Sequence, residues 1–228
     1  MKKVNYDNVA DVYKYRYQNA YSPDGIFKKL HKIELKNNFK TILEVGCGTG
    51  HWLKAFENNK IIIGIDPSFM MLAKAQKTSS SSYLIQGSSD HLPIKKNSID
   101  FIFCINAIHH FDDPEKFIVD CKSLLHPNGK LTVVCMNPHS GSDKWFLYEF
   151  FDGTMERDIR RYPSPENLET WLLKAGFSEI TFQVGERLKD RIVGKDIFPL
   201  PKEYTSQLSL LTDEQYETGI RKILHYTR

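Results

Sequence analysis

Three glycines lie within five residues, directly after a run of aliphatic residues. Gly46, Gly48 and Gly50 follow the apolar stretch at 41–45 and lead into a segment of helical character. Glycine adopts positive φ and, because it has no Cβ, lets a ligand approach the backbone closely. The start of a helix adds backbone N–H groups without partners inside the helix. A turn of this kind is typical of nucleotide-binding sites in open α/β sheets.

Two carboxylates accompany this turn. Asp66 ends the next aliphatic run, twenty residues after Gly46, where an acid that accepts both hydroxyls of a ribose is expected. Glu44 precedes the first glycine by two positions. Its charge would repel a pyrophosphate and would suit a ligand with a cationic amino group. A glycine turn beside a helix-capping aspartate is the simpler alternative, but the strand, the turn and the spaced acid together favour a ligand site.

The spacing of the glycines separates two classes of ligand. Dinucleotide-binding turns follow the pattern G-x-G-x-x-G. Here the third glycine comes one residue early, and His51 takes the place of the expected glycine. S-adenosylmethionine (SAM) carries an amino group and a ribose but no phosphate. The acids at Glu44 and Asp66 therefore favour SAM over a dinucleotide.

Two histidines follow the fourth apolar run and are candidates for acid–base chemistry. His109 and His110 lie just beyond the segment 99–106, and histidine suits a general base near neutral pH. Alternatively, one of them orients the loop while the other packs or is solvated. Alignment of the reactants alone supplies ~7–11 kcal/mol in good cases, so a base is optional. We expect no metal site, because no third ligand has suitable spacing.

The segment 138–163 is rich in aromatic and basic residues. One interpretation is a lid over the bound ligand, with an apolar substrate pocket and basic residues at its mouth. The other is a helical segment that packs its aromatic side chains into the core and exposes its charges. The candidate pocket residues are Trp145, Phe146, Tyr148 and Arg161.

These candidates need a sheet to position them. Apolar runs alternate with helical patterns, and their continuous Ile, Val, Leu and Phe content indicates strands covered on both faces. The fold class is therefore α/β, a Rossmann-like, doubly wound and mostly parallel sheet with helices on both faces. Strands are predicted at 41–45, 61–66, 82–87, 99–106 and 130–137, and helices at 51–58, 68–77 and 113–125.

The two ends of the chain are predicted from weaker patterns. Residues 4–35 have helical character, and residues 179–184 resemble a sixth strand. Helices begin after the N-caps Ser164 and Thr212, and 186–193 is a weak candidate for a seventh strand. We expect a single structural domain. Its parts are an N-terminal helical cap at 1–40 and a ligand-binding domain at 41–228, with the lid at 138–163 inserted after the fifth strand.

Composition restricts the class of protein. The chain has 228 residues, of which 41% are hydrophobic and 26% charged, and its net charge is +3. A dense Lys/Arg stripe is absent, which argues against a dedicated nucleic-acid binder. No secretory signal or ~20-residue apolar span is visible. The four cysteines have no C-x-x-C spacing, and reduced thiols favour a cytoplasmic protein.

Four motifs occur in the order found in one enzyme family. They read ILEVGCGTG, IIGIDPSFMMLAKA, QGSSDHLPIKKNSIDFIFCINAIHHFDDP and LLHPNGKLTVV. The chain resembles the class I SAM-dependent methyltransferases over about residues 41–135. Within that family it is most similar to the ubiquinone/menaquinone-biosynthesis-like group that acts on small molecules.

The resemblance implies a set of cofactor-binding residues. Tyr13 and Arg16 would cover the cofactor, and Asn106 would lie under its methionine end. In the family's G-D-A-x-x-L-P motif an acid accepts from the adenine amine, but this chain has Ser88 there, which implies a weaker bond. The full set is Tyr13, Arg16, Glu44, Gly46, Cys47, Gly48, Asp66, Pro67, Met71, Ser88, Ser89 and Asn106.

The resemblance implies transfer of a methyl group from SAM to an oxygen, nitrogen or carbon atom of a small molecule. Two alternatives stay open: an RNA- or tRNA-modifying methyltransferase, and a regulatory protein that binds SAM without catalysis. Enzymes that methylate exocyclic amines often carry a (D/N)-P-P-(Y/F) run after the fourth strand. This chain has the residues Asn-Ala-Ile-His at 106–109 instead. Nucleic acid is therefore the less favoured partner, and the oligomeric state is not predicted.

Overall fold

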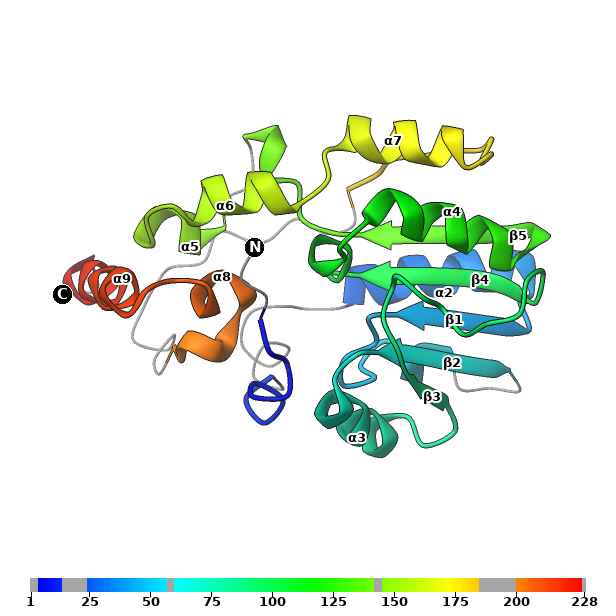
Figure 1. Cartoon of the computed structure of the whole chain (residues 1–228), viewed down its shortest axis with the longest axis horizontal. Helices are drawn as coiled ribbons and strands as arrows, with labels where there is room; N and C mark the ends of the chain where they lie inside the picture. Colours follow the sequence, from blue (N-terminus) through cyan, green and yellow to red (C-terminus); the bar gives the residue numbers. More distant parts are fainter. Residues whose placement is uncertain (1–3, 14–23, 57–59, 142–144, 185–199, 227–228) are drawn as a thin grey trace.

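A computed structural model of the chain describes residues 4–13, 24–56, 60–141, 145–184 and 200–226 (Figure 1). Five strands form one sheet in the order β3-β2-β1-β4-β5, and all neighbouring strands are parallel. The order reverses between β1 and β4, the place where ligands bind in open α/β sheets. The strands are β1 Thr41–Val45, β2 Ile61–Asp66, β3 Tyr83–Gln86, β4 Ile99–Ile105 and β5 Leu125–Val134.

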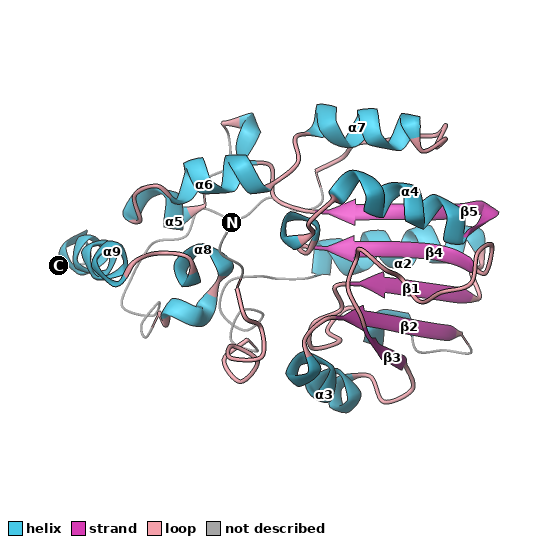
Figure 2. Ribbon diagram, in the orientation of Figure 1, coloured by secondary structure: helices cyan, strands magenta, loops and turns pink. Residues whose placement is uncertain are grey.

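Helices cover both faces of this sheet, as Figure 2 shows, and the predicted Rossmann-like α/β fold is confirmed. Asp113 and Ser164 cap α4 and α7 by accepting hydrogen bonds from backbone N–H groups three residues later, and a proline follows each cap. The elements around the sheet are α2 Asp24–Asn37, η1 Leu53–Phe56, α3 Phe69–Thr78, η2 Ile108–His110, α4 Pro114–Leu124 and α7 Pro165–Lys174.

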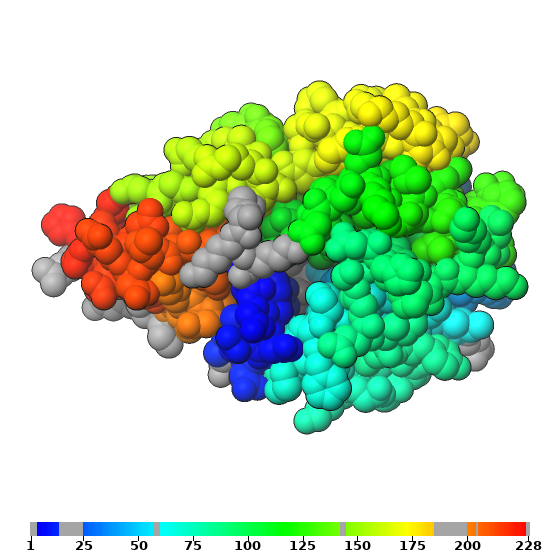
Figure 3. Space-filling view, viewed as in Figure 1, coloured from blue at the N-terminus to red at the C-terminus, as the bar shows by residue number. Residues whose placement is uncertain are grey.

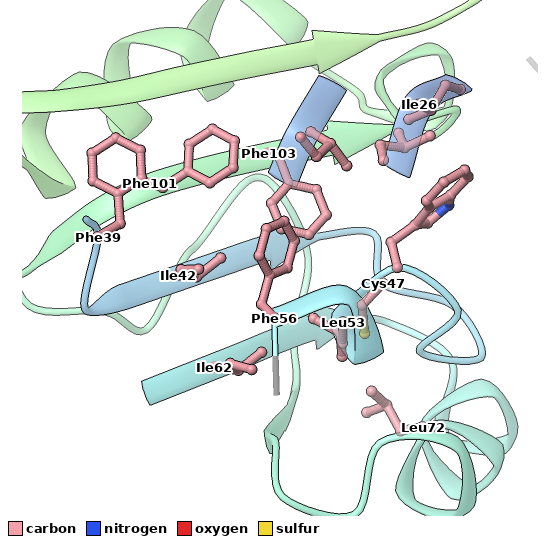
Figure 4. Close-up of a cluster of buried hydrophobic side chains, with 13 residues drawn as sticks. Ile26, Phe39, Ile42, Cys47, Leu53, Phe56, Ile62, Leu72, Phe101 and Phe103 are labelled. Carbon is pink, nitrogen blue, oxygen red and sulfur yellow. The ribbon is translucent and has the colours of Figure 1, made fainter. Parts of the chain in front are cut away.

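The core has two layers because successive strand residues point to opposite faces. On one face, Ile42 and the rings of Phe101 and Phe103 pack with α2 and η1 (Figure 4). On the other face, Leu43 and Ile102 pack with α4 and α7. Both layers are buried, which explains why the strands read as continuous apolar runs.

A second group of helices lies beyond the carboxyl ends of the strands (Figure 1). Leu147, Phe150 and Phe151 pack there with Leu208 and Ile223. We call these residues and their apolar neighbours the lid cluster. This cluster joins the insertion at 138–163 to residues 200–223. The elements are η3 Pro138–Ser140, α5 Phe146–Phe150, α6 Thr154–Arg161, η5 Lys202–Tyr204, α8 Ser206–Ser209 and α9 Asp213–Tyr226.

The structure corrects the predicted N-terminal helix. Residues 6–13 form turns, and a regular helix begins at Asp24. The turns are held by contacts to the sheet domain, since Asp7 accepts hydrogen bonds from the Ser68 hydroxyl and the Met70 N–H. Tertiary contacts therefore override the helical pattern in this segment.

The predicted sixth strand is wrong. Residues 177–184 have no regular secondary structure, and Phe182 and Val184 are exposed. Gln183 instead accepts a hydrogen bond from Lys29 on α2. The alternating pattern at 179–184 is typical of a strand with one apolar and one polar face. A strand also needs a neighbouring strand to pair with, and the local pattern does not report whether one is present. The candidate seventh strand at 186–193 lies outside the described residues.

The fifth strand begins earlier than predicted. β5 starts at Leu125, directly after α4, and its pairing with β4 shifts register between Ile99 and Phe101. Pro127 and Gly129 lie within this irregular first part of the strand. Among the described residues, no helix is both long and apolar enough to cross a membrane.

Candidate functional site

The glycine turn lies at the carboxyl end of β1 and is tied to β2. The N–H groups of Gly46 and Cys47 both donate to the Ile65 carbonyl, at 2.8 and 3.0 Å. Gly46 has φ 78° and Gly48 has φ 52°. A Cβ at position 46 would lie 2.4 Å from the Cβ of Ala107. Glycine is therefore required here by both backbone conformation and close approach.

Asp66 links this turn to the following crossover. Its Oδ2 accepts from the Gly48 N–H at 2.8 Å and its Oδ1 from the Ser68 N–H at 2.9 Å. Burial raises the pKa of this carboxyl, although the two backbone hydrogen bonds act in the opposite direction. Each oxygen keeps a further lone pair. The carboxylate is thus positioned by the backbone and can still accept from two hydroxyls.

Glu44 is a fully buried acid inside β1. Neither carboxyl oxygen has a hydrogen-bond partner among the described residues. Burial, and secondarily the charge of Asp66, raises its pKa well above the usual value. A buried polar group left without a partner is rare in proteins and indicates a missing ligand group or water. A cationic amino group would satisfy this carboxyl.

The N-terminal segment 4–13 covers the turn. In Figure 3 it lies, in blue, on the surface between the orange region that contains α8 and the sheet domain. Val9 and Ala10 pack against Met71, and Tyr13 Cε1 would lie 3.9 Å from a Cβ at Gly48. Tyr13 therefore reaches the glycine turn, in line with the predicted cover. Arg16, the other residue predicted to cover the cofactor, lies outside the described residues.

The remaining predicted cofactor residues lie around the same edge. The side chain of Cys47 packs into the core, so it faces a ligand only with its backbone. Asn106 follows β4 with φ 50°. Ser89 is buried, Ser88 is partly buried and Pro67 is exposed. The structure gathers these residues at one sheet edge, and their individual contacts with a cofactor stay predictions.

Both predicted catalytic histidines have phenolic partners. His109 is buried, its Nε2 lies 3.2 Å from the Tyr162 hydroxyl, and the two rings stack with centroids 4.0 Å apart. His110 Nε2 lies 2.7 Å from the Tyr6 hydroxyl. These contacts orient both rings. A catalytic role for either histidine stays a prediction.

The candidate pocket residues of the insertion are placed differently from one another. Trp145 and Phe146 pack against the lid cluster. Tyr148 and Arg161 both hydrogen-bond to Asp158, which is fully buried. Part of the insertion thus packs its aromatic residues as a core, as the structural alternative requires. Asp158 was not predicted as a buried residue, because a lone acid among arginines resembles a solvated charged face.

Comparison with known proteins identifies this architecture. A family model described as a methyltransferase domain matches residues 43–133. A tRNA U34 carboxymethyltransferase from Pseudoalteromonas atlantica is 28% identical over 157 residues, covering 66% of this chain and 47% of that protein. These matches support the class I SAM-dependent methyltransferase family that the sequence motifs predicted, and residues 43–133 carry the methyltransferase domain. The chain spans about half the length of the curated relatives it matches.

Solved structures show the same fold. A SAM-dependent methyltransferase from Aquifex aeolicus has a TM-score of 0.58 at 19% identity, covering 76% of this chain and 89% of that chain. A chain from the complex between the Haloferax volcanii Trm112 methyltransferase activator and a putative methyltransferase has a TM-score of 0.62 at 16% identity, covering 99% of this chain and 95% of that chain. The ubiquinone/menaquinone-biosynthesis-like subgroup is not distinguished by these matches.

SAM is the expected cofactor of this methyltransferase domain, and the residues present fit it. The buried, unpartnered carboxyl of Glu44 suits the amino group, and Asp66 retains acceptor capacity for the ribose. The glycine turn leaves the backbone open to the ligand.

The comparisons overturn one prediction from the sequence. A small-molecule acceptor was favoured and nucleic acid was disfavoured, but the curated relatives are named for a tRNA. A net charge of +3 averages over the whole chain and does not report local concentration of charge. Arg157, Arg160 and Arg161 all lie on the single helix α6.

Glu44 gives the domain a pH dependence of definite sign. Because its folded-state pKa is raised, the stability it contributes is complete below its usual pKa of 4.5 and is lost as the pH rises from there.

Binding of an amino cation should ionise Glu44 and release a proton. We expect calorimetry of S-adenosylhomocysteine in buffers of different ionisation enthalpy to detect this proton in the wild type. Glu44→Gln should bind more weakly and release none; equal proton release by both proteins would contradict the assignment.

Proposed function

We propose that this protein is a SAM-dependent methyltransferase that modifies a nucleotide of a tRNA. The observation that carries the proposal is the combination of the matched methyltransferase domain with relatives that are named as tRNA U34 carboxymethyltransferases. The absent (D/N)-P-P-(Y/F) run is compatible with this acceptor. That run belongs to enzymes that attack exocyclic amines, and a uracil ring has no exocyclic amine.

The reaction would take place at the carboxyl edge of the sheet. SAM would supply an electrophilic methyl group on a sulfonium. Glu44 and Asp66 would hold the amino group and the ribose, while Tyr13 would exclude water from one side. A nucleophile in line with the methyl group needs alignment above all, which contributes ~7–11 kcal/mol in good cases.

His109 and Tyr162 are the protein groups we assign to the acceptor side. Their pairing at 3.2 Å orients the imidazole beside the end of β4. In this proposal His109 accepts the proton of an acceptor hydroxyl as the new bond to carbon forms. A cytoplasmic location, predicted from the reduced cysteines, agrees with a tRNA substrate.

The function is tested by incubating the purified protein with SAM and with two tRNA preparations, unmodified transcripts and tRNA purified from cells, whose modified bases can carry a hydroxyl. Nucleoside digestion and mass spectrometry follow. We expect one nucleoside to gain a methyl group, with equimolar S-adenosylhomocysteine released. Asp66→Asn, deficient in the proposed ribose contact, is the negative control. Tight SAM binding without transfer to any RNA would refute the proposal and would favour a regulatory protein.

A further inference from the structure

Helix α6 carries two arginines one turn apart. Arg157 and Arg161 are separated by four residues, so their side chains are neighbours on the same face of the helix. Arg161 is buried, with 8% of its surface exposed. Arg157 is only partly buried, which leaves this site open to solvent on one side. Arg160, the residue directly before Arg161, is exposed to solvent on another face of the helix.

One carboxylate faces these two cations within the described part of the lid. Asp158 accepts from Arg161 Nη2 at 2.5 Å through Oδ1. Its Oδ2 accepts from the Tyr148 hydroxyl and from Gln207 Nε2, each at 2.9 Å. The site therefore has two positive charges and one negative charge, and most of the acceptor capacity of the carboxylate is already used.

Guanidinium nitrogens of both arginines lack an acceptor. Arg157 Nη1 and Arg161 Nε are buried, and neither has a hydrogen-bond partner among the described residues. A third donor of the insertion, Trp145 Nε1, is also buried and without a hydrogen-bond partner among the described residues. Burial, followed by the charge of Arg161, lowers the pKa of Arg157. Buried donors of one sign without acceptors indicate a ligand that supplies negative charge and acceptor oxygens.

We propose that Arg157 and Arg161 form a binding site for an oxyanion, the phosphate or carboxylate group of a substrate. The planar guanidinium fork matches both groups in geometry. The site is connected to the carboxyl edge of the sheet, because Tyr162 follows Arg161 and its hydroxyl contacts His109. This inference rests on the proposed function, in which a tRNA acceptor supplies the phosphate.

The test is the thermal stability of the full chain in inorganic phosphate compared with chloride at equal ionic strength. At about ten times the dissociation constant, phosphate should raise the wild-type Tm by roughly 3–5 °C. Arg157→Gln should abolish this rise. It should also raise the Tm in chloride, because it removes an uncompensated, partly buried charge, whereas a merely structural arginine would lower the Tm when replaced.

The matched control is Arg160→Gln, which makes the same change of charge on an exposed position of the same helix. It should retain the full response to phosphate. Loss of the response in both variants, or its persistence in Arg157→Gln, would overturn the site. Acetate and uridine 5′-monophosphate, with uridine as its control, identify the source: protection by acetate assigns a carboxylate, and protection by the nucleotide but not by uridine or acetate assigns a phosphate.

This measurement uses neither SAM nor tRNA. A failed transfer assay with intact phosphate protection would therefore reject the proposed function and keep the oxyanion site. Absence of phosphate protection in an active enzyme would reject the site alone. S-adenosylhomocysteine affinity should be equal in the wild type and in Arg157→Gln.

Discussion

Asp66→Asn should raise the dissociation constant of S-adenosylhomocysteine by about 100-fold or more. A hydrogen bond to a charged group contributes ~1.5–3 kcal/mol, and we assign two ribose hydroxyls to this carboxylate. The effect also has a geometric part. Both oxygens of Asp66 already face backbone N–H groups, those of Gly48 and Ser68. An amide must therefore turn its NH₂ group toward one of these donors, which disturbs the turn itself.

Asp100→Asn provides the matched control for this prediction. Asp100 also accepts two backbone hydrogen bonds, from the N–H groups of Lys40 and Thr41 at 2.9 Å each. It lies at the start of β4, the opposite edge of the sheet from the glycine turn. We expect a small loss of stability and unchanged ligand affinity in isothermal titration. Affinity of Asp66→Asn within threefold of the wild type would contradict the ribose assignment.

Gly46→Ala should destabilise the fold by about 2–5 kcal/mol. The left-handed backbone costs an L-residue ~1–2 kcal/mol, and overpacking adds ~1–3 kcal/mol. The overpacking arises because the new Cβ would lie 2.4 Å from the Cβ of Ala107. Denaturant unfolding with a two-state fit measures the loss. Ligand affinity should fall as well, since a shift of Ala107 moves the neighbouring residue Asn106.

Two further variants separate strain from crowding. Gly141 has φ 64°, and no atom of the described residues lies within 4 Å of a Cβ built there, so Gly141→Ala should lose only about 1–2 kcal/mol. The double variant Gly46→Ala with Ala107→Gly removes the collision and keeps the strained φ. It should recover stability relative to Gly46→Ala alone. No recovery would mean that the close approach of the two loops is not the cause.

The sheet and its site could be predicted from sequence because local patterns determine them. Buried parallel strands appear in the sequence as continuous apolar runs, as in the 99–106 segment. The turn after the first strand requires closely spaced glycines, a pattern that few other structures need. The carboxyl ends of parallel strands meet at one edge. This rule agrees with the family resemblance, which assigned residues as distant as Gly46 and Asn106 to one site without any knowledge of side-chain packing.

The rest depended on contacts between distant parts of the chain. The pattern at 4–13 predicts a helix, but hydrogen bonds between Asp7 and the start of α3 hold part of this segment in turns instead. The pairing of Tyr162 with His109 joins residues 53 positions apart, and no local pattern reports it. Asp158 resembles a solvated acid in sequence and is a fully buried acceptor in the structure. Nucleic acid was disfavoured partly from a net charge averaged over the chain, and this average does not report that three arginines lie on the single helix α6.

The lid cluster has a consequence for synthesis on the ribosome. Phe151 packs against Gly219, where an added Cβ would lie 2.1 Å from its ring, so this aromatic ring is enclosed only when α9 is present. All five strands are complete at Val134, long before that helix is made. The aromatic side chains of the insertion therefore stay exposed on the nascent chain until α9 has emerged from the ribosome. Chaperone binding to stalled chains should be strongest in this interval and should end once residue 223 has left the exit tunnel.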